Sequence, residues 1–195
     1  MIKQLTAALA VAALASLSSA ALAKAPMSPM HHSNTMSNAT DRMFTKTAAM
    51  GGTAEIALSK VALMKSHDSH VKKFARTMVH DHTILGHGLA VTASSNHLPA
   101  PMMMDAEHKA IKAKLMRLSG QKFDNAYMAA MINDHAATVN LFQNEMAHGQ
   151  NIHITNLAAK NVGLIQNHLQ MAHDLTGTPN KMGLKIKNPP MRPKM

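Results

Sequence analysis

The segment from Ser69 to His97 carries the feature that most limits the fold, an apolar stripe with strictly helical spacing. Its members recur at intervals of 4, 3, 4, 3 and 4 residues: Val71, Ala75, Met78, His82, Leu85 and Leu89. This spacing places all the side chains on one face of an α-helix, whereas a half-buried strand would alternate with a period of two. The segment therefore predicts a long helix with an imidazole in the middle of its buried face.

The rest of the chain shows the same periodicity, and no segment shows the sustained alternation of β-branched residues that is typical of a strand. We expect helices over residues 41–66, 69–97, 105–118, 121–148 and 151–175. Thr40 is the expected cap of the first helix and Asp105 that of the third, Pro99 stops the second, and Gly149 closes the fourth. The expected class is all-α. Four long helices form a bundle, and the short third helix carries the chain across it.

Large apolar residues are few, because only 3% of the chain is aromatic. Besides the stripe of residues 69–97, the helical spacing predicts the following inward positions: Phe44, Ala48, Gly51, Leu58, Ala62, Ile111, Leu115, Leu118, Phe123, Tyr127, Met131, Phe142, Met146, Ile154, Leu157, Ala158, Ile165 and Leu175. Several of these residues are small, so we expect the helices to approach one another closely.

Residues 1–23 have the three parts of a secretory signal peptide. Lys3 supplies the positive start, residues 5–17 are apolar, and Ala21-Leu22-Ala23 forms the cleavage site ahead of Lys24. The apolar stretch is shorter than the roughly 20 residues that a membrane-spanning helix needs. We therefore expect export to the periplasm and no transmembrane span. The chain has no cysteine to carry a lipid anchor, so any association with the outer membrane would be peripheral.

Both flanks of the helical region have the composition of disordered segments. Residues 24–40 form a lead rich in Ser, Pro, Asn, Met and His, whereas residues 176–195 hold five basic residues, four prolines and no acidic residue. The excess of Lys and Arg over Asp and Glu lies mostly in this basic tail. No aromatic residue is interleaved with the charges, so nucleic-acid binding is not expected. An anionic envelope surface is the expected partner of the tail.

Ionisable residues occupy the middle of the buried face on each long helix, which is the main functional signal of the sequence. The candidates for a metal site are two inward histidines with an adjacent aspartate, one further histidine and one glutamate: Glu55, Asp81, His82, Asp134, His135 and His168. Inside a bundle each such group must be paired, hydrogen-bonded or bound to a metal. Imidazole and carboxylate donors suit a transition-metal ion such as Fe, Mn, Zn or Cu. The two aspartates are candidates either for ligands or for partners that orient the imidazoles.

Two other hypotheses fit the same residues. The buried histidines and glutamate can hydrogen-bond to one another as a metal-free polar layer that sets the helix register, in a structural or interaction module of the envelope. Alternatively, thioether and imidazole groups in the lead can bind copper, since they are soft donors. The candidate residues for this soft-metal site are Met27, Met30, His31, His32 and Met36.

Residues along the helices also resemble a known bacterial family, the domain of unknown function 4142. The residues that carry the resemblance are Phe44, Ala48-Ala49, Gly51-Gly52, Glu55, Phe74-Ala75, Met78, Asp81-His82, Phe123-Asp124, Tyr127, Asp134-His135 and His168. Members are often labelled predicted outer membrane proteins and are grouped with ferritin-like helical bundles. The resemblance covers residues 41–175 and implies a ferritin-like fold, but it implies no activity.

The ferritin analogy implies a di-metal carboxylate site, from which this chain departs. Its one Glu-x-x-His pair, Glu145 and His148, lies near a helix end and is interpreted as surface. His108, His153 and His173 are likewise expected to be solvated. The central layer is rich in imidazole, which favours a single ion over a bridged pair. No serine triad, phosphate loop or nucleotide fingerprint is present, so the sequence identifies no enzyme activity.

Overall fold

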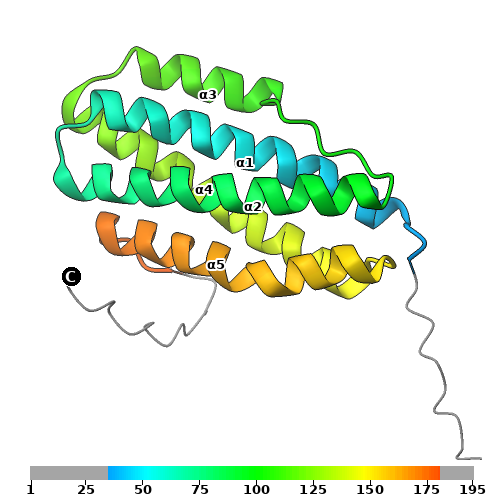
Figure 1. Ribbon diagram of the computed structural model, residues 1–195. Helices are drawn as coiled ribbons and strands as arrows, with labels where there is room; N and C mark the ends of the chain where they lie inside the picture. The colour runs from blue at the N-terminus through cyan, green and yellow to red at the C-terminus, as the bar shows by residue number, and fades with distance from the viewer. Residues whose placement is uncertain (1–34, 181–195) are drawn as a thin grey trace, which may run out of the picture. The chain divides into compact units, whose positions relative to one another are not determined.

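The computed structural model describes residues 35–180, which form five α-helices and no strand (Figure 1). The helices are α1 (Ala39–Lys65), α2 (Ser69–Ser95), α3 (Ala106–Met116), α4 (Gly120–His148) and α5 (Ile152–Thr176). Each lies within about two residues of an expected helix, so the all-α prediction is confirmed. No helix within residues 35–180 combines the length and hydropathy required to cross a bilayer.

The four long helices form a bundle in which neighbours run antiparallel. Short turns join α1 to α2 and α4 to α5. At one end of the bundle, the backbone N–H of Asn151 at the start of α5 donates to Asp41 near the start of α1 (3.1 Å). The side chain of Asn151 also donates to Asn96, which follows α2 (3.0 Å). Consequently α2 and α4 run in the same direction, and the chain between them must travel back along the bundle.

The return is made by residues 96–119, which include α3 packed against α1 and α4 (Figure 1). This long crossover confirms the expected ferritin-like arrangement, a four-helix bundle with a short additional helix between the second and third long helices. The sequence alone left open which helices are parallel, because all the polar positions lie near mid-helix and fit either arrangement.

Side-chain caps explain where the helices begin. Asn38 caps α1 through a reciprocal capping box with Asp41, so the cap lies two residues before the one expected at Thr40 and the helix begins at Ala39. Asp105 caps α3 as expected, by accepting from the backbone N–H of His108 at 2.8 Å. The start of α1 therefore includes the last residues of the segment that composition assigned to a disordered lead.

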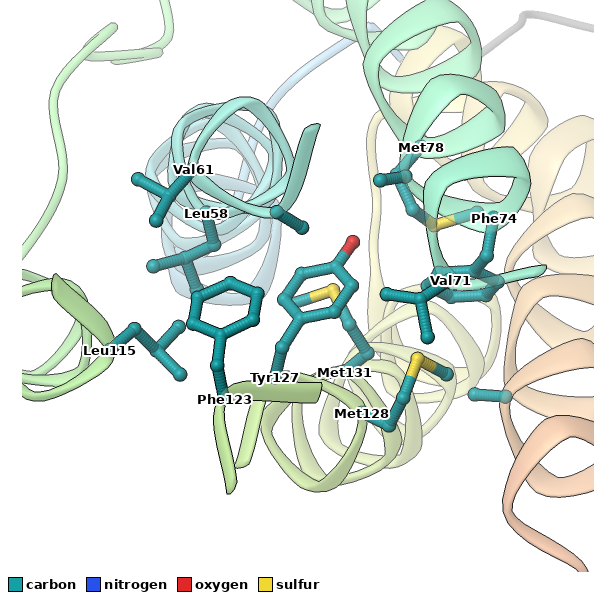
Figure 2. Close-up of a cluster of buried hydrophobic side chains, with 13 residues drawn as sticks. Leu58, Val61, Val71, Phe74, Met78, Leu115, Phe123, Tyr127, Met128 and Met131 are labelled. Carbon is teal, nitrogen blue, oxygen red and sulfur yellow. The ribbon is translucent and has the colours of Figure 1, made fainter. Parts of the chain in front are cut away.

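The core consists of two apolar clusters that follow one another along the bundle. The tyrosine cluster surrounds Tyr127, with side chains from α1 to α4 drawn in Figure 2, and the Tyr127 hydroxyl is 2.8 Å from that of Ser59. The phenylalanine cluster contains Phe44 and Phe142, whose rings meet edge to face with centroids 4.9 Å apart. The one tyrosine and four phenylalanines of the chain are all buried. These few aromatic side chains fill both clusters.

Two of the expected core positions are wrong. Met146 is 45% exposed and Leu175 is 40% exposed. In α4 the buried face continues from Val139 through Phe142 to Glu145, at intervals of three residues, and this rotation turns Met146 outward. Leu175 lies in the last turn of α5, next to the end of the bundle, where little packs against it.

The remaining predictions on the flanks fall on residues outside 35–180. These are the signal peptide, residues 24–34 of the lead and residues 181–195 of the basic tail. Of the soft-metal candidates, Met27, Met30, His31 and His32 also lie outside the described residues, whereas Met36 is 76% exposed.

Candidate metal centre

A polar layer lies at mid-height, between the tyrosine cluster and the phenylalanine cluster. It is made of Glu55 from α1, His82 from α2, His135 from α4 and His168 from α5, each at most 2% exposed. The three imidazole rings form a nearly equilateral triangle, with centroids 5.2 to 5.5 Å apart. The structure thus brings together four side chains from four helices that the sequence placed on separate buried stripes.

One nitrogen of each imidazole is engaged with a protein acceptor. His82 Nδ1 lies 2.9 Å from Glu55 Oε2, and His168 Nε2 lies 2.9 Å from Asp81 Oδ2. His135 Nδ1 lies 2.8 Å from the carbonyl oxygen of Met131, one turn earlier in α4. In each case the ring N–H donates to the oxygen, and this contact fixes the orientation of the ring.

The opposite nitrogens have no such partner. His82 Nε2, His135 Nε2 and His168 Nδ1 are buried and make no hydrogen bond to the protein. One ring nitrogen from each histidine lies within 4.8 Å of the corresponding atom of the other two. Buried polar atoms are normally satisfied, so three unpaired nitrogens on three adjacent rings indicate a missing partner. A metal-binding histidine typically donates its second N–H to a carboxylate or carbonyl, as all three do here.

Electrostatics make Glu55 the fixed negative charge of the layer. Burial alone would raise the pKa of its carboxyl group, but the surrounding imidazoles, His135 and His82 foremost, lower it to about 2. For His82, burial opposes the charged form, while the adjacent Glu55 carboxylate outweighs burial and raises the pKa. Glu55 and His82 therefore form a buried ion pair that joins α1 to α2.

The other two imidazoles are held neutral. Burial lowers the pKa of His135, and the nearby His82 lowers it further. Burial, followed by repulsion from His135 and His82, lowers the pKa of His168 to about 4 although Asp81 opposes this shift. A neutral imidazole whose N–H is already donated presents a lone pair on its other nitrogen, which is the form that binds a metal ion.

The two aspartates take different positions. Asp81 contacts the centre through His168 and also accepts from the exposed His80 at 2.8 Å, so it links the centre to the surface. Asp134 comes directly before His135 in α4 but points in another direction. Its Oδ1 lies 3.7 Å from Nε2 of His108 on α3. Adjacent residues on a helix point about 100° apart. Asp134 consequently faces α3, whereas His135 faces the bundle axis.

His108 was expected to be solvated, and this expectation is wrong. Its side chain is only 16% exposed and lies between Asp134 and Asp105, whose Oδ2 is 2.7 Å from Nδ1. Asp134 raises the pKa of His108 to about 9 against the effect of burial, and Asp105 adds to the increase. The charged ring thus fastens α3 to α4. In the sequence, the spacing of three residues between Asp105 and His108 at a helix start could have indicated this contact.

Glu145 was interpreted as a surface residue but is fully buried, next to Asp41. Asp41 itself accepts backbone N–H groups from Asn38 at 2.6 Å and Asn151 at 3.1 Å, so its carboxylate ties α1 to the turn before α5. Burial and then the neighbouring Asp41 raise the pKa of Glu145 to about 8. Glu145 is thus a neutral carboxylic acid in the fold near pH 7. In the sequence, its position three residues after Phe142 could have indicated that it lies on the buried face of the helix.

The substitution Glu145→Gln should remove a pH-dependent loss of stability. The folded-state pKa of about 8 exceeds the ordinary value of 4.5. In the wild-type protein, protonated Glu145 therefore contributes its full stability below about pH 4.5, and this contribution is lost as the pH rises through about 8. Glutamine mimics the neutral acid at every pH. The melting temperature of the variant relative to that of wild type should rise between about pH 5 and about pH 8.5. Glu107→Gln, at an exposed site, should show no such rise. A difference that is constant with pH would contradict the assignment.

The fold and the centre together define a ferritin-like helical bundle with a buried cluster of three histidines at mid-height. The chain belongs to the family described as Domain of unknown function (DUF4142), which it matches over residues 26–175. Comparison with curated proteins finds no match.

Two solved structures have a similar fold. A DUF305 protein from Streptomyces coelicolor is 15% identical, with a TM-score of 0.61 over 71% of this chain and 91% of that chain. A DUF305 fragment from Deinococcus radiodurans is 14% identical, with a TM-score of 0.64 over 72% of this chain and 97% of that chain. At these identities the likeness concerns the fold alone.

Proposed function

We propose that the protein binds one transition-metal ion through His82, His135 and His168. The observation that carries this proposal is a group of three buried histidines, each of which has one ring nitrogen without a hydrogen-bond partner and can offer one ring nitrogen within 4.8 Å of those of the other two. Glu55, the Met131 carbonyl and Asp81 each hold one ring nitrogen. The neutral His135 and His168 therefore keep a lone pair on the other nitrogen, and His82 gains one when it releases a proton on binding the ion.

The donor set restricts the kind of ion. Three imidazoles suit zinc, copper or iron, whereas calcium, magnesium and manganese favour oxygen ligands. A bridged di-iron centre of the ferritin type needs several carboxylates from facing helices. Two carboxylates contact the rings, and each already accepts from a histidine, Glu55 from His82 and Asp81 from His168. A single ion therefore fits this layer better than a pair does.

The proposal places this metal site in the cell envelope, in metal handling or in protection against oxidative stress. Support for export comes from the signal-peptide pattern of residues 1–23, and the basic residues of the tail supply the charge for contact with an anionic surface. Recovery of a protein that begins at Lys24 from the periplasm of the native host would test export. A full-length chain retained in the cytoplasm would contradict it.

The metal proposal is tested by titrating the mature, metal-free protein with zinc and copper and by measuring bound metal after dialysis. We expect a single tight site, and a loss of affinity of about 100-fold or more in His135→Ala, since even an outer partner of a ligand contributes 10- to 100-fold. His153→Ala, at an exposed position on α5, is the matched control and should bind like wild type.

The same titration separates the metal site from its alternatives. If the layer is a metal-free element that sets helix register, wild type and His135→Ala will take up equally little metal. If the Met- and His-rich lead binds copper instead, His135→Ala will retain the copper stoichiometry of wild type. Either result would reject the proposed centre.

A further inference from the structure

A small cavity adjoins the three-histidine centre on the side of His82. Its volume is about 20 Å³, and Glu55 and His82 form part of its wall. A cavity needs about 10–15 Å³ of space for the centre of a water-sized sphere to hold one water molecule. Most of the remaining wall is apolar and comes from Leu85, Leu89, Phe142 and Ile165. The space therefore fits a single water-sized molecule and little more.

Glu55, which lines this cavity, also carries a buried hydrogen-bond acceptor without a partner. Glu55 Oε2 is occupied by His82, but Glu55 Oε1 is buried without a hydrogen-bond partner. His135 Nδ1 lies 3.3 Å from Oε1, but its N–H donates a hydrogen bond to the Met131 carbonyl at 2.8 Å. An unpaired carboxylate oxygen in an apolar environment is costly. A molecule that donates a hydrogen bond from the cavity would satisfy it.

We propose that the metal centre is of the open type, with one coordination position that faces this cavity and holds an exchangeable water hydrogen-bonded to Glu55 Oε1. The proposal rests on the three-histidine site proposed above. Structural metal sites are closed by four protein ligands, whereas catalytic sites have three and leave a position to water or substrate. Here three imidazoles lie close together, and the two carboxylates that contact them, Glu55 and Asp81, already accept from His82 and His168.

The cavity also restricts what can replace the water. Its apolar walls and the Glu55 carboxylate act against an anion, whereas a bound metal ion would attract one. The volume of about 20 Å³ suits one or two heavy atoms. His82 and Gly86 also line a larger neighbouring pocket of about 260 Å³. The ligand class that fits the small cavity is a molecule of this size that can donate a hydrogen bond to Glu55.

Two glycines of α2 provide a matched test. Gly86 lines the cavity, whereas Gly88, two residues later, does not. A Cβ atom added at either glycine has no heavy atom within 4 Å, so both positions accept a side chain. Gly86→Leu should extend into the space beside the centre, and Gly88→Leu should leave the space unchanged. Ala48→Leu narrows the cavity from α1 and serves as a second, independent obstruction.

The experiment is pulsed electron paramagnetic resonance of the copper(II)-loaded mature protein in D₂O. In wild type and Gly88→Leu we expect couplings from imidazole nitrogens together with coupling from exchangeable deuterons of bound water. In Gly86→Leu and Ala48→Leu we expect the nitrogen couplings to persist and the deuteron coupling to be lost.

The outcomes distinguish this inference from the metal proposal. Nitrogen couplings without deuteron coupling in wild type would show a closed site, which overturns the open position and leaves the metal site intact. Deuteron coupling that persists in both Gly86→Leu and Ala48→Leu would show that the water lies elsewhere, and this also overturns the inference. Absence of imidazole coupling in wild type would reject the metal site and the open position together.

Discussion

Saturating the mature protein with its metal ion should raise the melting temperature by roughly 8 to 16 °C. Binding to the folded state alone contributes about 4 kcal/mol when the free ion exceeds the dissociation constant about 1,000-fold. Each kcal/mol is equivalent to about 2–4 °C for a domain of this size. The gain requires the three imidazoles in their folded arrangement, because one ring nitrogen of each lies within 4.8 Å of the others only when α2, α4 and α5 are packed.

Differential scanning calorimetry with and without zinc measures this effect. In a His82→Ala plus His135→Ala variant the shift should fall to nearly zero, whatever the stability of the metal-free variant. His153→Ala, with its side chain exposed on α5, should keep the full shift. An equal shift in the double variant would place the bound ion elsewhere on the chain.

Phe142→Ala should be the most damaging single core substitution tested here, with a loss of about 3–5 kcal/mol in the free energy of unfolding. Phe142 is buried in the phenylalanine cluster, where its ring packs edge to face on Phe44 at 4.9 Å. The chain has only four phenylalanines and one tyrosine, so the neighbouring small residues have little volume with which to refill the cavity.

Urea unfolding curves measure this loss directly. Met64→Ala is a suitable control because it also removes a large apolar side chain, but one that is 69% exposed. The control should change the unfolding free energy by less than about 0.5 kcal/mol. A loss of similar size in both variants would contradict the assignment of Phe142 to an anchoring position.

The sequence predicted the helices and the polar layer because both follow from local periodicity. Val71, Ala75, Met78, His82 and Leu89 are buried as their spacing requires. The same reasoning placed Glu55, His135 and His168 inward, and all three are buried. Helical spacing decides which face a residue occupies, so it decides burial wherever the apolar stripe is continuous.

Other features could not be predicted because they depend on tertiary contacts. Glu145 was assigned to the surface because it lies near a helix end, away from the central layer, and only the fold shows that Asp41 lies beside it. The contrast between Asp81 and Asp134 has a similar origin, since each precedes a histidine but the two meet different helices. The identity of the free ring nitrogen depends on partners such as the Met131 carbonyl, which no spacing rule specifies.

The ligands of the proposed ion come from both halves of the bundle, which has a consequence for a chain that contains no cysteine. His82 belongs to the α1–α2 hairpin, whereas His135 and His168 belong to the α4–α5 hairpin. An ion held by all three would cross-link the hairpins and close the long loop that contains α3. Such a link restricts the unfolded chain much as a disulfide does, with the largest gain for long loops. Unlike a disulfide, it would be reversible by chelation and indifferent to thiol reductants.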